Sequence, residues 1–493
     1  MQSPVSYDLI LYILSFLADK SQILYRLALV NREFNQAASK ILYAQVILCP
    51  SYHHIAPNLK DNGLLTEPSQ FISAKLPRYS SFVERLHIAG FLSTRAPPNN
   101  KLHAALCKAV QSFTHLQSVS FTPVSYHEDI FVESLKIIQK RSTLEELTVN
   151  RSCFDEPNIT NPMSSSGLAT LGEEDEEQEE QEREPPITKT QLLASFRNLI
   201  KLSLHDPTRA ILQALIPGWL DALSGTLTDL HLMASHFGNC GSITPGVLRS
   251  AIPHLERICS FSIGLSYSLT DQDVFNALSQ LPNLNTLRIN YYLQNTSPPR
   301  FAPLRQLRAL TVCHNRPETR RERDGLCKWI RKAVATSPLE RLSLEDESES
   351  GNETSANLAL DPLIDHLVAI HAKRLKVLDM RLSFVGVEKF RFLCSQCTEL
   401  EEMSLVVDRN ALARWSPQRL FVEHGSAMKR LHTATFNVCH SRPTRKDIDD
   451  RLAHEMVTSA PNLRQLVVNK RKWEGSWVYT EGGAVEFQVH RIT

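Results

Sequence analysis

The chain has 493 residues, too many for one ordinary hydrophobic core, so the length predicts either several domains or one repetitive array. Hydrophobic residues make up 42% of the chain and charged residues 22%, which excludes wholesale disorder and collagen-like structure. Lys plus Arg (54) nearly balances Asp plus Glu (53), which removes the simplest electrostatic argument for a dedicated nucleic-acid binder.

The N-terminal residues 5–47 carry three short apolar stretches at helical spacing and no strand pattern. The stretches are Leu9–Leu17, Leu24–Val30 and Phe34–Leu42. A helical module this small has a limited core and tends to present apolar surface to a partner. Because Leu9–Leu17 has no Lys or Arg before it and no small-residue cleavage site after it, we do not interpret it as a signal peptide.

A repeat organises the chain from residue 83 to residue 468. The pattern L-x-x-L-x-L, with other aliphatic residues allowed, recurs at an average spacing of about 32 residues. Between the copies, apolar residues recur at the spacing of an α-helix, for example at 271–281, 324–335, 363–370 and 448–457. Each unit is therefore predicted to be a helix followed by a short strand, and stacking of units buries the leucine face of a parallel sheet.

Two segments depart from the repeat. The first contains the acidic run Glu173–Glu184 and several prolines and serines, so we expect residues 155–190 to form a disordered insert. Residues Glu345–Ser355 are predicted to be a smaller acidic loop. At the C-terminus, residues 477–492 alternate around Gly482-Gly483, which predicts a β-hairpin that caps the last repeat.

The repeats resemble leucine-rich repeats of the long, irregular kind, and the N-terminal segment resembles an F-box. The residues that carry the second likeness are Asp8–Ile10, Ile13–Leu17, Leu27–Phe34, Ala38-Ser39 and Ile41–Tyr43. An F-box followed by leucine-rich repeats is the layout of substrate receptors of Skp-cullin-F-box ubiquitin ligases. The resemblance implies that the F-box docks on the small adaptor subunit and that the repeats capture a protein substrate.

By this resemblance, seven apolar residues are expected to face the adaptor or to support the residues that do. They are Leu9, Ile10, Ile13, Leu14, Leu17, Leu24 and Val30. Apolar residues at helical spacing are also typical of a core, so spacing alone divides them about evenly between contact and core.

Alternation along the strands places one side chain of every two on the face opposite the leucines. That face is expected to be concave and to bind the substrate. Its predicted residues are Glu146, Thr148, Lys201, Ser203, Asp229, His231, Thr286, Arg288, Arg341, Ser343, Asp379, Arg381, Glu402, Ser404, Gln465 and Asn469. The mixture of both charge signs and hydroxyl groups favours a protein surface over a uniformly acidic polymer.

No phosphate-binding, dinucleotide-binding or zinc-protease motif occurs in the sequence. Cys394 and Cys397 form a lone C-x-x-C, which we interpret as core packing rather than as a redox or zinc site. His366 and His371 are five residues apart, a spacing that predicts different faces of an α-helix.

Short basic clusters occur at Arg316–Arg323, Arg442–Lys446 and Lys470–Lys472. Because such runs are weakly specific for RNA or nuclear import, we interpret them as solvated loops.

The sequence thus predicts an α/β chain with four parts. An F-box-like three-helix module (1–48) is followed by a linker or first irregular unit (49–80), a leucine-rich-repeat solenoid (81–470) and a hairpin cap (471–493). The leading hypothesis is a non-catalytic, cofactor-free substrate receptor of a ubiquitin ligase in the cytoplasm or nucleus, with an adaptor and a protein substrate as partners and no membrane or nucleic acid. The alternatives are a repeat scaffold that joins no ligase and, less favoured, an enzyme with an unfamiliar site.

Overall fold

The computed structural model divides into two compact units, Met1–Ser242 and Ile243–Thr493. The residues that the structure describes are 6–50, 69–92, 100–125, 131–154, 188–233, 243–264, 269–291, 301–346, 359–408, 417–439, 450–469, 471–479 and 485–492. Most of the predicted acidic insert, the Gly482-Gly483 turn and the basic cluster at 442–446 lie outside these residues.

The first unit begins with three helices: α1 (Tyr7–Ser15), α2 (Ser21–Leu27) and α3 (Arg32–Tyr43). Asn31 starts α3 because its side-chain oxygen accepts a hydrogen bond of 2.9 Å from the backbone N–H of Phe34. The buried residues that join the three helices are Ile10, Leu14, Leu24, Ala37 and Ala38. This core is small, so each of its large side chains matters for the stability of the module.

A parallel sheet follows directly after α3. Its strands, in spatial order, are β1 (Gln45–Leu48), β2 (Arg85–Phe91), β3 (Ser118–Ser125), β4 (Glu146–Val149), β5 (Lys201–His205) and β6 (Asp229–Met233). The helices between them are α5 (Ser69–Ala74), α6 (Pro77–Ser80), α7 (Asn100–Ser112), α8 (Val132–Gln139), α9 (Lys189–Ala194), α10 (Arg209–Ala214) and α11 (Leu220–Leu223). The sheet therefore begins at Gln45, earlier than the predicted start of the solenoid at residue 81, because β1 pairs with β2.

The second unit repeats the same plan. Its parallel strands are β7 (Ser260–Ile263), β8 (Thr286–Tyr291), β9 (Ala309–His314), β10 (Arg341–Asp346), β11 (Val377–Val385), β12 (Glu402–Asp408), β13 (Thr433–Cys439) and β14 (Gln465–Val468). Its helices are α12 (Pro245–Ala251), α13 (Asp271–Leu278), α14 (Arg320–Val334), α15 (Asp361–His366), α16 (Val387–Gln396), α17 (Pro417–His424) and α18 (Asp450–Ser459).

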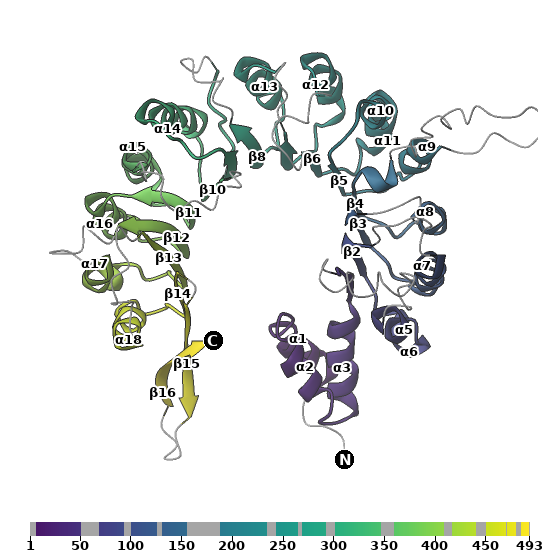
Figure 1. Cartoon of the computed structure of the whole chain (residues 1–493), viewed down its shortest axis with the longest axis horizontal. Helices are drawn as coiled ribbons and strands as arrows, with labels where there is room; N and C mark the ends of the chain where they lie inside the picture. The colour runs from purple at the N-terminus through teal and green to yellow at the C-terminus, as the bar shows by residue number, and fades with distance from the viewer. Residues whose placement is uncertain are drawn as a thin grey trace, which may run out of the picture. The chain divides into compact units, whose positions relative to one another are not determined.

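In both units the helices that connect the strands cover one face of the sheet (Figure 1). The leucines of the repeat point toward the helices and form ladders across neighbouring strands, as in Leu147, Leu202 and Leu230, which lie side by side in register. All three are fully buried. The structure thus has the mostly parallel, open sheet of a repetitive helix–strand array. We call the opposite face of the sheet the helix-free face. It carries the strand side chains that alternate with the buried leucines.

The C-terminal hairpin consists of β15 (Arg471–Tyr479) and β16 (Val485–Ile492), which pair antiparallel. It begins at Arg471, six residues before the predicted alternation at 477, and β15 pairs antiparallel with β14. Trp473 is 1% exposed, and its indole N–H donates a 2.9 Å hydrogen bond to the Asp450 carboxylate of α18. This contact ties the hairpin to the last helix at the end of the leucine core.

Helix α14 begins at Arg320, whereas the apolar spacing predicted a start at Asp324. The reason is a capping box: the Thr319 hydroxyl accepts from the Glu322 N–H, and the Glu322 carboxylate accepts from the Thr319 N–H, both at 3.2 Å. Arg320–Arg323 are therefore the first turn of a helix, not the loop that the sequence analysis predicted.

The prediction that His366 and His371 lie on different helix faces was wrong. Residues Leu367–His371 (η5) form a π-helical turn, in which positions five apart align. The two imidazole rings meet edge to face with centroids 5.4 Å apart. His371 is 1% exposed, and burial, followed by the charges of His366 and Arg374, lowers the pKa of His371 to about 4.

The buried His371 is expected to make the second unit sensitive to acid. Between pH 6.5 and 4 the unfolded chain binds a proton that the folded chain does not, so the free energy of unfolding falls as the pH falls through this window. At pH 5 the loss should reach up to about 2 kcal/mol. Urea unfolding at pH 7.5 and 5.0 should show a larger loss for the wild type than for His371→Leu. Equal losses in both proteins would contradict this assignment.

Candidate protein-interaction surfaces

Helix α1 is apolar on two opposite sides. One side, with Ile10 and Leu14, is buried in the three-helix core. The other side has an i, i+3, i+4, i+7 stripe formed by Leu9, Tyr12, Ile13 and Phe16, with exposed fractions of 48%, 63%, 50% and 69%. We call these four residues the α1 stripe. The rings of Tyr12 and Phe16 pack edge to face with centroids 5.0 Å apart, which holds part of the stripe in place.

More apolar side chains are exposed on and after α2. They are Ile23, Tyr25, Leu29 and Val30, of which Leu29 and Val30 are 70% and 61% exposed. Large apolar side chains gathered on so short a segment make it a candidate interaction surface.

The seven residues predicted for the adaptor fall into two groups. Ile10, Leu14 and Leu24 are core residues, and Leu17 packs against that core while half-buried. Leu9, Ile13 and Val30 are exposed and can touch a partner. Sequence reasoning missed Tyr12 and Phe16 as contact candidates, although their spacing from Leu9 was a usable signal.

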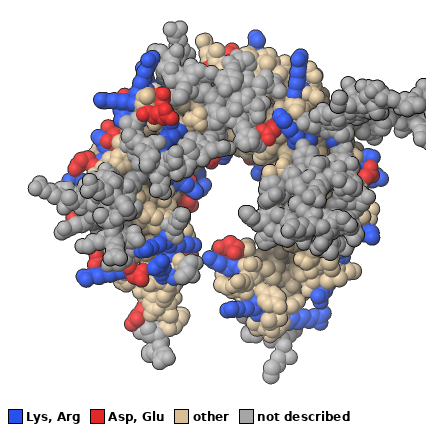
Figure 2. Space-filling view, viewed as in Figure 1, with Lys and Arg blue, Asp and Glu red and all other residues tan. Residues whose placement is uncertain are grey.

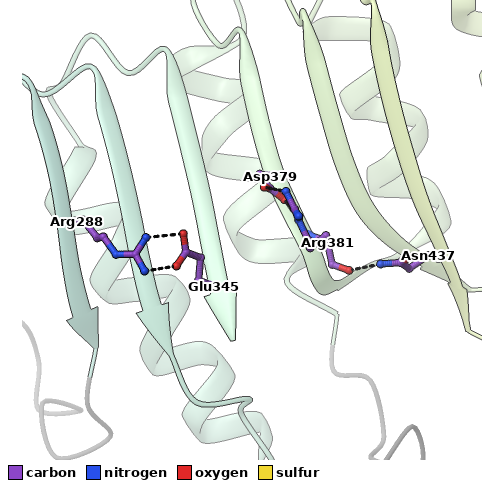
Figure 3. Close-up of polar contacts among 5 residues, drawn as sticks. All are labelled: Arg288, Glu345, Asp379, Arg381 and Asn437. Atoms are coloured by element: carbon purple, nitrogen blue, oxygen red, sulfur yellow. Dashed lines mark hydrogen bonds and ion pairs between the residues drawn. The ribbon is translucent and has the colours of Figure 1, made fainter. Parts of the chain in front are cut away.

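On the helix-free face of the second unit, charged side chains reach across neighbouring strands (Figure 3). Arg288 of β8 makes a two-pronged ion pair with Glu345 of β10, with N–O distances of 2.8 and 2.5 Å, and so spans the intervening strand β9. Glu345 lies within β10, whereas the sequence analysis placed it at the start of an acidic loop, of which residues 347–355 lie outside the described ranges.

A second polar group lies farther along the same face. Arg381 donates to Asp379 from Nε at 3.0 Å and from Nη2 at 2.5 Å. These hydrogen bonds and the charge of Asp379 raise the pKa of Arg381. The side-chain amide of Asn437 donates to the backbone carbonyl of Arg381 at 2.7 Å, which links β11 to β13 (Figure 3).

The other predicted residues of this unit lie in the rows set by strand register. Thr286, Arg341 and Glu402 share one row, and Arg288, Ser343, Asp379 and Ser404 share the next. Arg341 and Glu402 are exposed and flank the apolar Val377, whereas Thr286, Ser343, Ser404 and Gln465 are half-buried. Asn469, at the end of β14, is exposed and has a left-handed backbone (φ 56°), and its side-chain oxygen accepts a hydrogen bond of 2.8 Å from the Val438 N–H.

In the first unit, Glu146, Lys201 and Asp229 lie side by side on β4, β5 and β6. The Ser118 hydroxyl donates to Glu146 at 2.9 Å. Thr148, Ser203 and His231 form the next row, but Ser203 is only 4% exposed because it lies between two larger side chains. Ser203 therefore offers almost no surface to a partner.

Several residues of these rows were missed by sequence reasoning. Thr311, Thr433 and Thr435 are half-buried on the helix-free face and lie in register with predicted residues. The alternation that selected their neighbours could have found them. The face thus presents hydroxyl groups between charges of both signs. This composition is typical of surfaces that bind a folded protein or a peptide.

The C-x-x-C cysteines are in the core. Cys394 lies in α16 and Cys397 just after it, both fully buried, and burial raises the pKa of both thiols, that of Cys397 to about 12. Protonated, buried thiols are poor nucleophiles and poor metal ligands. Within the described ranges, no group of three or more His, Cys, Asp or Glu side chains is arranged to hold a metal ion. Likewise, no helix in that part of the chain is long and apolar enough to cross a membrane.

Comparison with known proteins gives only a weak structural similarity. No protein-family model matches the chain, and no curated protein matches it in sequence. Among solved structures, a chain of the crystal structure of the Rad7 and Elc1 complex in yeast is similar, with 13% sequence identity and a TM-score of 0.36 over 98% of this chain and 96% of that chain. A similarity this low carries no information about function.

Proposed function

We propose that the chain is a non-catalytic substrate-recognition subunit of a Skp-cullin-F-box ubiquitin ligase. In this proposal the N-terminal helices are an F-box that docks on the ligase adaptor. The helix-free face, built from leucine-rich repeats, binds a protein substrate. The receptor would bring the substrate to the ligase and raise its effective concentration there, without bond chemistry of its own.

The observation that carries the proposal is the α1 stripe. The opposite side of α1 already fills the core of its module, so the stripe is apolar surface beyond what folding requires. An exposed helix stripe with i, i+3, i+4 and i+7 anchors is the typical means by which one helical protein docks on another. The mixed-charge sheet rows supply a second, separate surface, as a receptor that joins two proteins needs.

The test is binding of the purified full chain to the purified adaptor by isothermal titration calorimetry. We expect wild-type binding at micromolar concentration or tighter. Ile13→Asp should weaken it at least about tenfold, because a contact side chain is lost and a charge is placed in an apolar interface. Val30→Asp should act in the same direction.

The matched control is Gln22→Asp, which introduces the same charge at an exposed polar position of α2 and should change the affinity less than about twofold. Circular dichroism of each variant checks that the chain is folded. If the folded wild type does not bind the adaptor at micromolar concentration, the receptor proposal fails and the repeat-scaffold alternative replaces it.

A further inference from the structure

A groove of about 760 Å³ lies on the helix layer of the second unit, lined by α14 and by the start and end of α15. We call it the α14–α15 groove. It is on the side of the sheet opposite the helix-free face, and it contains none of the residues of the α1 stripe. Binding at this groove would therefore not involve the residues proposed to dock on the adaptor.

The groove is strongly cationic. The charged side chains that line it are Arg320, Arg323, Lys328, Arg331, Lys332 and a single carboxylate, Asp324. Lys and Arg side chains gather over α14 in the space-filling view, with a smaller group of Asp and Glu (Figure 2).

The arrangement of ion pairs leaves most of this charge uncompensated. Asp324 contacts Arg323 at 2.7 Å and Arg320 at 4.0 Å. The other nearby acid, Glu322, is occupied by the backbone N–H groups of Glu318 and Thr319 in the helix cap. Lys328 and Lys332 make no ion pair with any described residue, so their ammonium groups face solvent.

The floor of the groove is neutral. Burial raises the pKa of the Cys327 thiol to about 12, and burial together with the Arg331 charge lowers the pKa of His366. The Nε2 atom of His366 is buried without a hydrogen-bond partner. The groove thus has cationic walls over a neutral floor, and an anionic chain segment complements these features.

We propose that the α14–α15 groove binds an acidic peptide segment, rich in Asp and Glu, of a partner protein. From Arg320 to Lys332 the cationic residues follow one side of α14 over about 18 Å, the length of an extended peptide of about six residues. Arg guanidinium groups bind carboxylates in a two-pronged geometry. Single-stranded nucleic acid is less suitable, because such sites stack bases on aromatic rings, and none of the described residues that line this groove is Phe, Tyr or Trp.

The experiment is fluorescence anisotropy of a labelled peptide of alternating Asp and Glu, eight residues long, titrated with the full chain. We expect saturable binding that weakens as salt is raised. The double variant Lys328→Glu/Arg331→Glu should weaken binding at least about tenfold. The double variant Lys373→Glu/Lys429→Glu is the matched control: it makes the same charge change in the same unit, but both residues are exposed and neither lines the groove, so affinity should change less than about twofold.

Circular dichroism melts establish that both variants are folded. Absence of peptide binding to the wild type, or an equal loss for the groove and control variants, would overturn the proposal. A dT oligonucleotide of the same charge serves as a competitor. If it binds the groove more tightly than the peptide and loses binding in the same double variant, the site is a nucleic-acid site and the peptide assignment is wrong.

Discussion

Trp329→Ala is expected to destabilise the second unit by about 3–5 kcal/mol, the usual cost of removing a large aromatic side chain from a core. Trp329 of α14 is 1% exposed. Its ring contacts Phe275 of α13, Tyr291 of β8 and Phe301, with centroid distances of 5.5, 5.4 and 6.0 Å. Phe275 and Phe301 stack on each other at 3.7 Å. Truncation would leave a cavity that no single element can close.

The measurement is urea unfolding followed by far-UV circular dichroism, combined with hydrogen exchange by mass spectrometry. Loss of protection should be concentrated in α13, α14 and β8, because these elements meet at the Trp329 ring. Trp329→Phe retains an aromatic ring at the site and should lose clearly less stability. A cost below about 1 kcal/mol for Trp329→Ala would contradict the packing described for this cluster.

The repeat could be predicted from the sequence because its signal is redundant. Leucines such as Leu147 and Leu202 recur with the same local spacing, and each copy confirms the strand assignment of the others. Strand β1 could not be predicted in this way. It has only four residues, and its partner β2 lies far along the chain, so its pairing depends on tertiary contacts and not on a local pattern.

Two features of the helices were not predicted from the sequence, for a different reason. The basic run Arg316–Arg323 predicts a solvated loop, whereas the T-x-x-E capping signal of Thr319 and Glu322 predicts the helix start that the structure has. The contact between His366 and His371 could not be predicted from their spacing. That argument assumes an α-helix with 3.6 residues per turn, and the π-helical turn Leu367–His371 has more residues per turn. In both cases the structure differs from the prediction because of local backbone hydrogen bonding, which cannot be inferred from amino-acid composition.

For the candidate surfaces, the sequence predicted which positions are apolar but not which way they point. Leu9 and Ile13 were grouped with Ile10 and Leu14, and only the packing of α1 against α3 separates the exposed pair from the buried pair. The ion pair between Arg288 and Glu345 was also beyond sequence reasoning, because it joins strands that are not neighbours in the sheet.

Leu14→Asp is expected to unfold the N-terminal module, whereas Ile13→Asp is expected to leave it folded. Leu14 is 1% exposed and belongs to the small core shared by α1, α2 and α3. Replacing it removes a buried aliphatic side chain, at about 2–5 kcal/mol, and places a carboxylate among apolar groups. A module of this size has little stability in reserve. Ile13 is half exposed, so its replacement should cost less than about 1 kcal/mol.

The two variants place the same charge at adjacent positions of one helix, so helix propensity and the helix dipole affect them alike. Any difference between them therefore reports which side of α1 is the core. Hydrogen exchange of residues 7–43 should show full loss of protection in Leu14→Asp and wild-type protection in Ile13→Asp. Both variants should bind the adaptor poorly, the first because its module is unfolded and the second because its contact surface is altered. Retained protection in Leu14→Asp would show that the three-helix core is packed differently, and the exposed α1 stripe would then no longer support the proposed docking.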